Sequence, residues 1–210
     1  MLTVEKGFTL LELVLTLFLS VILMYLIFSV FFVTSNSASL VKESASLQEC
    51  ARGMLNILLS DIRRAGSVPN CPDNNCCSAI VQADDSSLSI KFDINGDNDC
   101  DDPGEYIKYY VNNSTLFRQD VNSSDTEIII GNFYSLDCFK FFYILDDGTE
   151  ISNPTDLFRI KSIKFKAVIK TNTKILKFHD TNNYQICGPF NDNYLREYIE
   201  GLASIRSRSI

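Results

Sequence analysis

The first third of the chain changes from an uninterrupted apolar run to an amphipathic pattern. Residues 8–33 carry a single charged side chain, Glu12. A helix rises about 1.5 Å per residue, so this run can cross the roughly 30 Å hydrocarbon core of a membrane. The small polar residues 34–39 mark either a break in the helix or its exit from lipid. The pattern therefore predicts a transmembrane helix over residues 8–33.

The next segment has apolar residues at helical spacing. They are Leu40, Leu47, Ala51, Met54, Leu58 and Ile62. Charged side chains fall mostly between these positions, so one helical face would pack against a folded head. Arg63 and Arg64 suit the negative end of a helix dipole, Gly66 suits a left-handed cap, and Pro69 prevents continuation. We expect an amphipathic continuation of the helix over residues 34–66, ending near Ala65 and Gly66.

Beyond Pro72 the pattern changes to short runs rich in Ile, Val, Phe and Tyr, separated by Asn, Asp, Gly and Ser. These runs predict strands, over residues 79–83, 88–94, 106–112, 115–119, 127–131, 136–145, 159–170 and 175–179. Alternation over residues 163–170 predicts one buried and one solvated face. Its reversal over residues 158–162 predicts a bulge near Ser162 and Ile163. Residues 192–205 fit either a helix or a strand. With the long helix before these strands, the chain is predicted to be α+β with a β-rich head at 67–210.

Composition argues against several functions. The formal net charge is -7, so a phosphate backbone would be repelled and a nucleic-acid partner is not expected. The single histidine, His179, argues against a histidine-rich metal site and against Ser–His catalysis. A lysine row at 164, 166 and 170 could form a DNA-binding strip, but a solvated sheet face explains it better. No nucleophile, oxyanion site or cofactor loop is recognisable, so we do not expect an enzyme.

Seven cysteines are many for 210 residues. Six lie beyond residue 70, which indicates disulfides and an oxidising compartment. The disulfide candidates are Cys71, Cys76, Cys77, Cys100, Cys138 and Cys187. Their spacing does not match a zinc site. The odd count leaves at least one thiol unpaired unless it bridges to another chain.

An acidic stretch at residues 93–105 is the one site-like pattern in the head. Its oxygen-bearing candidates are Asp93, Asn95, Asp97, Asp99, Asp101, Asp102 and Glu105. Alternating oxygen ligands suit a hard cation, and Asp-x-Asn-x-Asp matches the opening of an EF-hand loop. Asn98 stands where that loop has Gly, and Glu105 comes one place late. The pattern favours calcium as the one cofactor, against the alternative of a solvated acidic turn.

Glu12 lies in the stretch GFTLLEL, residues 7–13. A secretory signal peptide has a shorter apolar region than this run. An ordinary membrane anchor fits the length but leaves Glu12 unexplained, because a carboxylate in hydrocarbon is costly unless it is paired. The stretch resembles the processing motif of type IV pilins and type II secretion pseudopilins. The resemblance implies a leader of residues 1–7, cleavage between Gly7 and Phe8, and N-methylation of Phe8. Glu12 would then pair with the new N-terminal amine of a neighbouring subunit.

Residues 44–71 resemble a segment of PilW-type minor pilins more specifically. The matching residues are Leu47, Gln48, Glu49, Asp61, Ile62, Arg63, Ala65 and Gly66. Pseudopilins of the J class share a looser version of this pattern. Cys50 departs from it and is a candidate for the unpaired thiol. The resemblance implies the pilin fold, in which a long N-terminal helix packs on a predominantly antiparallel β-sheet head, and it favours a C-terminal strand.

The resemblance also implies a location and partners. The protein would be a single-pass protein of the bacterial inner membrane with a periplasmic head, and would then enter a pilus or pseudopilus filament. Its partners would be membrane lipid, other pilins and minor pilins, the prepilin peptidase and an inner-membrane assembly platform. The function implied is that of a minor pilin that primes or tips a type IV pilus. The alternatives are a type II secretion pseudopilin and a membrane-anchored, calcium-dependent binding domain.

Overall fold

The computed structural model describes residues 9–67, 78–131, 133–175 and 178–205. The chain divides into two compact units, Met1–Ser44 and Ala45–Ile210. One helix, α1 (Leu10–Arg64), contributes to both units. The other regular elements described in the second unit are strands and a short 3-10 helix, η1 (Leu157–Arg159). The α+β prediction is therefore confirmed.

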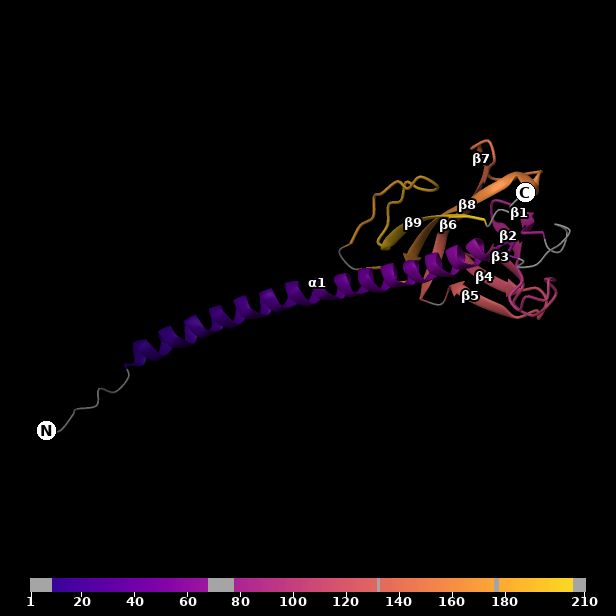
Figure 1. The fold of residues 1–210 in the computed structure, drawn as a ribbon. Coiled ribbons are helices and arrows are strands. Elements are labelled where there is room, and N and C mark those ends of the chain that lie inside the picture. Colours follow the sequence, from indigo (N-terminus) through magenta and orange to yellow (C-terminus); the bar gives the residue numbers. More distant parts are fainter. Residues whose placement is uncertain (1–8, 68–77, 132, 176–177, 206–210) are drawn as a thin grey trace. The chain divides into compact units, whose positions relative to one another are not determined.

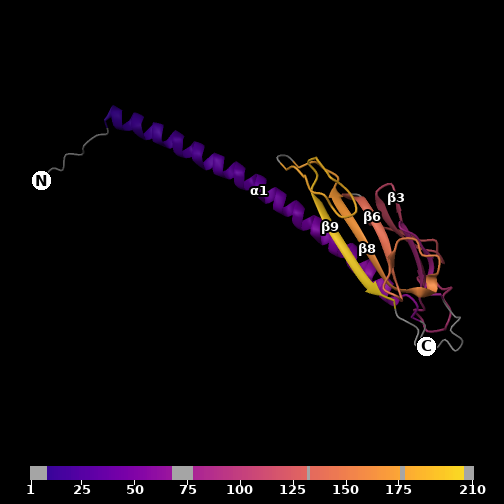
Figure 2. The same cartoon turned by 90° about the horizontal axis from the view of Figure 1, so that it is seen from above.

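Two antiparallel sheets form the head (Figure 1). The first has the order β1-β2-β3-β4-β5 and the second the order β7-β6-β8-β9, with β6, β8 and β9 side by side in Figure 2. The strands of the first sheet are β1 (Ile80–Ala83), β2 (Ser87–Lys91), β3 (Tyr106–Asn112), β4 (Thr115–Asp120) and β5 (Thr126–Ile130). The strands of the second are β6 (Tyr134–Leu145), β7 (Glu150–Ile151), β8 (Ile160–Thr171) and β9 (Arg196–Ser204).

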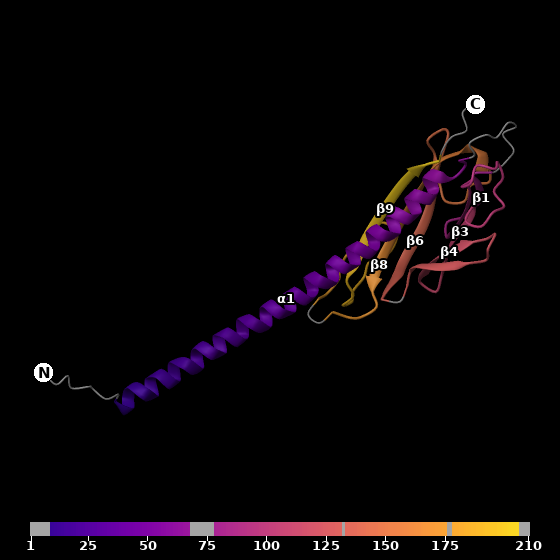
Figure 3. The ribbon, with the colours of Figure 1, turned by 60° about the horizontal axis from the view of Figure 1, so that its bottom comes forward.

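The core lies between the C-terminal part of α1 and the sheets, as Figure 3 shows for the helix over β6, β8 and β9. The buried apolar residues of α1 are Leu47, Ala51, Met54, Leu58 and Ile62. They form one cluster with strand residues such as Ile107, Phe141 and Phe165. The amphipathic prediction is therefore confirmed for residues 45–64. Leu40 lies in the first unit and is partly exposed.

The helix ends where the sequence predicts. Gly66 has a φ of 75°, the left-handed conformation that terminates many helices. Its N–H donates to the carbonyl of Lys91 at 2.9 Å, and the N–H of Ser67 donates to the carbonyl of Arg64 at 2.9 Å. Pro69 lies outside the described residues. The end of α1 is thereby fixed to the end of β2.

The strand predicted over residues 175–179 needs correction. Residues 175, 178 and 179 are not in a strand, and 176–177 lie outside the described residues. The Ile175 N–H donates to the carbonyl of Asn193 and an isolated bridge joins Asp180 to Asp192, so polar contacts rather than a ladder organise this segment. The bulge predicted near Ser162 and Ile163 is confirmed. It falls at the adjacent Lys161, because Ile144 pairs with Ser162 and Leu145 with Ile160.

The C-terminal segment is strand β9, as the resemblance favours. Its apolar residues have a helical spacing, yet Leu202 is 53% exposed while Gly201 and Ala203 are buried. Nine pairings with β8 decide the outcome. Tertiary pairing has overridden a local helical pattern here.

The close packing of Phe165 against position 201 leaves room only for glycine there. It pairs with Phe165 of β8, and a Cβ at this position would lie 2.5 Å from two ring atoms of Phe165. Because Phe165 is fully buried, Gly201→Ala should lower the free energy of unfolding by about 1–3 kcal/mol. Urea denaturation of the full chain in detergent, followed by near-UV circular dichroism, measures this loss.

Gly53→Ala is the matched control. Gly53 is an exposed helical residue, and a Cβ there would meet nothing within 4 Å. Because Gly is a poor helix former, this substitution should stabilise the protein by up to about 1 kcal/mol. Equal effects of the two substitutions would contradict the packing role of Gly201.

Candidate functional site

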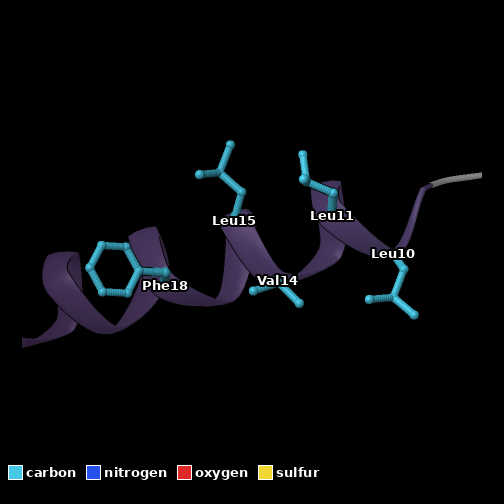
Figure 4. Close-up of a pocket in the computed structure, with 5 residues that line it drawn as sticks. All are labelled: Leu10, Leu11, Val14, Leu15 and Phe18. Carbon is cyan, nitrogen blue, oxygen red and sulfur yellow. The ribbon is translucent and has the colours of Figure 1, made fainter.

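The N-terminal part of α1 carries an extended apolar surface. Every side chain from residue 10 to residue 33 is exposed. Among the described residues, α1 is the helix long and apolar enough to cross a membrane, with a mean hydropathy of 2.7 in its most apolar 18-residue window. At its start an apolar pocket is lined by Leu10, Leu11, Val14, Leu15 and Phe18 (Figure 4). An exposed apolar surface of this extent calls for lipid or other apolar helices to cover it.

Five hydroxyl groups of this part of α1 are hydrogen-bonded within the helix. The hydroxyls of Thr16, Ser20 and Ser29 donate to carbonyls three residues earlier. Those of Thr34 and Ser37 donate to carbonyls four residues earlier, at 2.8 and 3.0 Å. Hydroxyls that are satisfied in this way can enter an apolar environment at a smaller cost. α1 continues without a break through residues 34–39, so these residues do not interrupt the helix.

Glu12 lies in the first turn of α1. Its N–H donates to Oγ1 of Thr9 at 3.3 Å, so Thr9 caps the helix and Glu12 is the third residue after the cap. Thr-x-x-Glu is the pattern of a capping box, and the helix dipole favours a negative charge at this end. The structure thus adds Thr9 as the helix cap, which the sequence analysis missed although the Thr-x-x-Glu pattern can be seen in the sequence. Gly7 and Phe8 lie outside the described residues, and the pairing of Glu12 with a neighbouring amine stays a prediction.

The acidic stretch divides into buried and exposed carboxylates. Asp93 accepts from the N–H groups of Gly96 and Asn98 at 2.6 and 3.0 Å. Glu105, which is 1% exposed, accepts from those of Ile94 and Asp102 at 2.8 and 3.3 Å. The structure therefore uses these two candidate ligands to fix the path of the loop.

Three exposed carboxylates come together. Ligand atoms of Asp97, Asp99 and Asp102 lie within 4.8 Å of one another. The amide of Asn95 donates to Asp97 at 2.8 Å and to Asp102 at 2.6 Å. Desolvation, and then the negative charge of Asp97, raise the pKa of Asp102. Asp101 lies 3.4 Å from the Lys91 ammonium. The candidate cation site thus has three carboxylates instead of an alternating row.

Asp120, the last residue of β4, and Asn122, in the turn that follows, support this loop. Oδ2 of Asp120 accepts from the Gly104 N–H at 2.7 Å. The Asn122 amide donates to the carbonyl of Asp102 at 2.7 Å and to that of Cys100 at 3.2 Å. The sequence analysis missed both residues, because nothing in their local pattern indicates a contact some twenty positions away.

The described cysteines fit the disulfide prediction. Cys138 and Cys187 form a disulfide with 6.3 Å between their Cα atoms, and Cys100 is also disulfide-bonded. Cys71, Cys76 and Cys77 lie outside the described residues. Cys50 is a free, half-buried thiol on α1, and burial raises its pKa. The prediction that Cys50 is unpaired is confirmed.

The lysine row of β8 is paired. Lys164 forms ion pairs with Glu150 and Glu200, and Lys170 forms one with Asp137. The Lys166 ammonium donates to Gln185 at 3.0 Å. These partners favour the interpretation of the row as an ordinary solvated sheet face.

Two buried polar clusters join elements that are distant in sequence. Asp61 of α1 accepts from Tyr109 of β3 and Arg118 of β4. In the second cluster, Arg196 of β9 binds three carboxylates, those of Asp137, Asp180 and Asp192. The resemblance had marked Asp61, but no local pattern indicated the partners in either cluster.

Comparison with known proteins identifies the fold. A type IV-like pilin from Thermus thermophilus is similar in structure, with a TM-score of 0.50 and 13% sequence identity. The similarity covers 76% of this chain and 96% of the pilin. No protein-family model and no curated protein sequence matches the chain. The chain therefore has the pilin fold, a long N-terminal helix packed on antiparallel sheets, as predicted.

Proposed function

We propose that this chain is a pilin that assembles into a filament through its N-terminal helix. The observation that carries the proposal is the exposed apolar surface of residues 10–33, with Glu12 as its one charged side chain, on a chain with the pilin fold. In a membrane, lipid covers this surface. In a filament, the helices of neighbouring subunits cover it. The same surface thus serves as an anchor first and as an assembly interface afterwards.

Processing of the N-terminus completes the proposed interface. Cleavage between Gly7 and Phe8, followed by methylation of Phe8, places a cationic amine two residues before Leu10. Burying this amine together with a neighbour's Glu12 costs far less than burying either charge alone. The Leu47–Gln48–Glu49 and Asp61–Gly66 motifs favour a PilW-like minor pilin, in a priming or tip complex of a type IV pilus. A type II secretion pseudopilin uses the same assembly chemistry and is the alternative.

The proposal places the protein in the bacterial inner membrane before assembly, with the head in the periplasm. The disulfide between Cys138 and Cys187 fits that oxidising compartment. Its partners would be other pilins, the prepilin peptidase and the assembly platform, and its role would be structural, not enzymatic.

The N-terminus of the protein from its native membrane tests the proposal. Intact mass and N-terminal peptide mass spectrometry should find a methylated Phe8 as the first residue. Deletion of the prepilin peptidase should restore Met1. A chain that keeps Met1 while the peptidase is active would contradict the proposal.

The cluster of Asp97, Asp99 and Asp102 favours a second candidate, a calcium-dependent binding domain on a membrane anchor. Three oxygen ligands within reach of one ion suit calcium. Calcium should therefore raise the melting temperature of the full chain by several degrees, because a ligand that binds only the folded state stabilises it. Differential scanning calorimetry with calcium and with a chelator measures the shift.

Matched variants make the calcium prediction specific. Asp99→Asn should abolish the calcium-dependent shift, whereas Asp156→Asn, which removes a carboxylate from the cap of η1 elsewhere in the head, should preserve it. Identical melting of the wild-type chain in calcium and in chelator would show that the loop is a solvated acidic turn.

A further inference from the structure

A single buried carboxylate connects α1 to the first sheet. The Asp61 side chain is 8% exposed. Its Oδ2 accepts from Nε of Arg118 at 2.9 Å and from the Tyr109 hydroxyl at 2.7 Å. Tyr109 is fully buried and Arg118 is 22% exposed. Burial, and then the negative charge of Asp61, raise the pKa of Tyr109, so its hydroxyl remains a donor.

The apolar face of this part of α1 is broad. Cys50, Leu55 and Leu59 flank the buried stripe and are partly buried, and Ile57 is 40% exposed. A displacement of the helix by four residues, about one turn, would replace each core residue by the residue four positions earlier. The replacements for Ala51, Met54, Leu58 and Ile62 would be Leu47, Cys50, Met54 and Leu58. All four are apolar, so burial of apolar area discriminates poorly over the middle of the stripe. At its two ends Leu47 would be replaced by Glu43 and Ala65 by Asp61, which disfavours the displaced placement there.

The polar contacts do discriminate between them. In the displaced placement Ile57 would stand at the position of Asp61, facing Arg118 and Tyr109. The buried Tyr109 hydroxyl would then lose its acceptor, and Arg118 would keep only its longer ion pair with Glu127, at 3.5 Å. A buried polar group left unpaired in this way is strongly unfavourable. A single polar residue on an apolar helix face sets the register of coiled coils by the same logic.

We propose that the contact of Asp61 with Arg118 and Tyr109 is a register latch, which fixes the axial position of α1 on the head. Other contacts agree with this register but are weaker. The Arg64 guanidinium lies 4.6 Å from the centroid of the Phe92 ring. The Gly66 N–H bond to Lys91 is one backbone bond at the helix end. The Tyr134 hydroxyl bond to Ser46, at 2.8 Å, is exposed to solvent.

The latch has a consequence for assembly, and this step rests on the proposed function. A slip of four residues would change by about 6 Å the length of helix that precedes the head. In a filament built by helix packing, that length decides which heads can meet. The latch itself is a property of the folded head and holds whether or not the chain assembles.

Distance measurement by pulsed electron spin resonance tests the latch. Nitroxides are attached to the full chain in detergent at Asn56→Cys on α1 and Asn112→Cys at the end of β3, both exposed, in a Cys50→Ser background. The otherwise wild-type chain should give one narrow distance. Asp61→Leu should add a second population, because neither placement then satisfies Arg118 and Tyr109. One unchanged narrow distance in Asp61→Leu would overturn the latch.

A transposed variant sharpens the test. Ile57→Asp combined with Asp61→Leu moves the carboxylate by one turn, so the helix should slip to return it to Arg118, and the second distance should dominate. A transposed variant with the wild-type distance alone would also overturn the proposal. Arg118→Gln combined with Tyr109→Phe removes both donors from the strand side and should give the same two populations if Asp61→Leu does not fold. Asp146→Asn, which alters an exposed ion pair with Arg159, is the control and should leave the distance unchanged.

Discussion

Glu12→Gln should leave the chain in the membrane and reduce its incorporation into filaments about tenfold or more. The amide keeps the size of the side chain and can still take part in a capping box, but it cannot neutralise a buried amine. An unpaired charge in an apolar environment costs at least a few kcal/mol, and 1.4 kcal/mol already corresponds to a factor of ten. Immunoblots of sheared filaments and of membranes from the same cells measure the ratio.

Two further variants separate the charge of Glu12 from its place in the helix cap. Thr9→Ala removes the hydroxyl that accepts the Glu12 N–H but keeps the carboxylate, so it should assemble nearly normally. Glu12→Ala removes both the charge and the box partner and should fail like Glu12→Gln. Normal incorporation of Glu12→Gln together with failure of Thr9→Ala would assign Glu12 to the helix start and refute its pairing role.

The predictable parts of this fold are those that local patterns encode. Helical spacing of Leu47, Met54 and Leu58 gives the buried face of α1, and Gly66 gives its end, because each signal lies within a few residues of its effect. The prediction of a strand over residues 175–179 was wrong, because a short apolar run does not by itself supply a strand to pair with. Strand β9 shows the reverse case, since β8 imposes a ladder on residues with helical spacing.

The candidate sites follow the same division. Glu12 and the acidic loop could be found from sequence because a charge in an apolar run and a cluster of carboxylates are both local anomalies. The sequence could not show which of these carboxylates lie close together in the folded loop. Asp93 and Glu105 accept hydrogen bonds from backbone N–H groups instead of joining the carboxylate cluster, and the positions of these N–H groups depend on the folded loop. The ion pairs of Asp61 and Arg196 join residues up to 59 positions apart, beyond any local pattern.

Arg196→Met should lower the free energy of unfolding by about 3–5 kcal/mol, because it breaks a buried ion pair by removing one partner. The Arg196 side chain is 1% exposed and lies 2.6 to 2.9 Å from oxygens of Asp137, Asp180 and Asp192. Its guanidinium also stacks on Phe190, 3.8 Å from the ring centroid. Without it, three carboxylates stay close together, and Lys170 pairs with one of them, Asp137. Urea denaturation at pH 7, followed by near-UV circular dichroism, measures the loss.

Arg159→Met is the matched control for that loss. Arg159 also binds two carboxylates, those of Asp146 and Asp147, but all three side chains are more than 40% exposed. Water can replace an exposed ion pair, so this variant should unfold at the same urea concentration as the wild type. Equal losses in the two variants would mean that charge neutralisation, and not burial, governs the stability of the head.

The pH dependence of the Arg196→Met effect provides an independent check. Hydrogen bonds from Arg196 are the largest cause that lowers the pKa of Asp192, to about 2. A carboxyl whose pKa is lower in the folded than in the unfolded state stabilises the protein above its unfolded pKa, near 4, and this stabilisation is lost as pH falls through the folded pKa. The difference in stability between wild type and Arg196→Met should therefore shrink as pH falls from about 4 to about 2. A difference that stays constant over this range would show that Arg196 acts through packing on Phe190 rather than through its carboxylate partners.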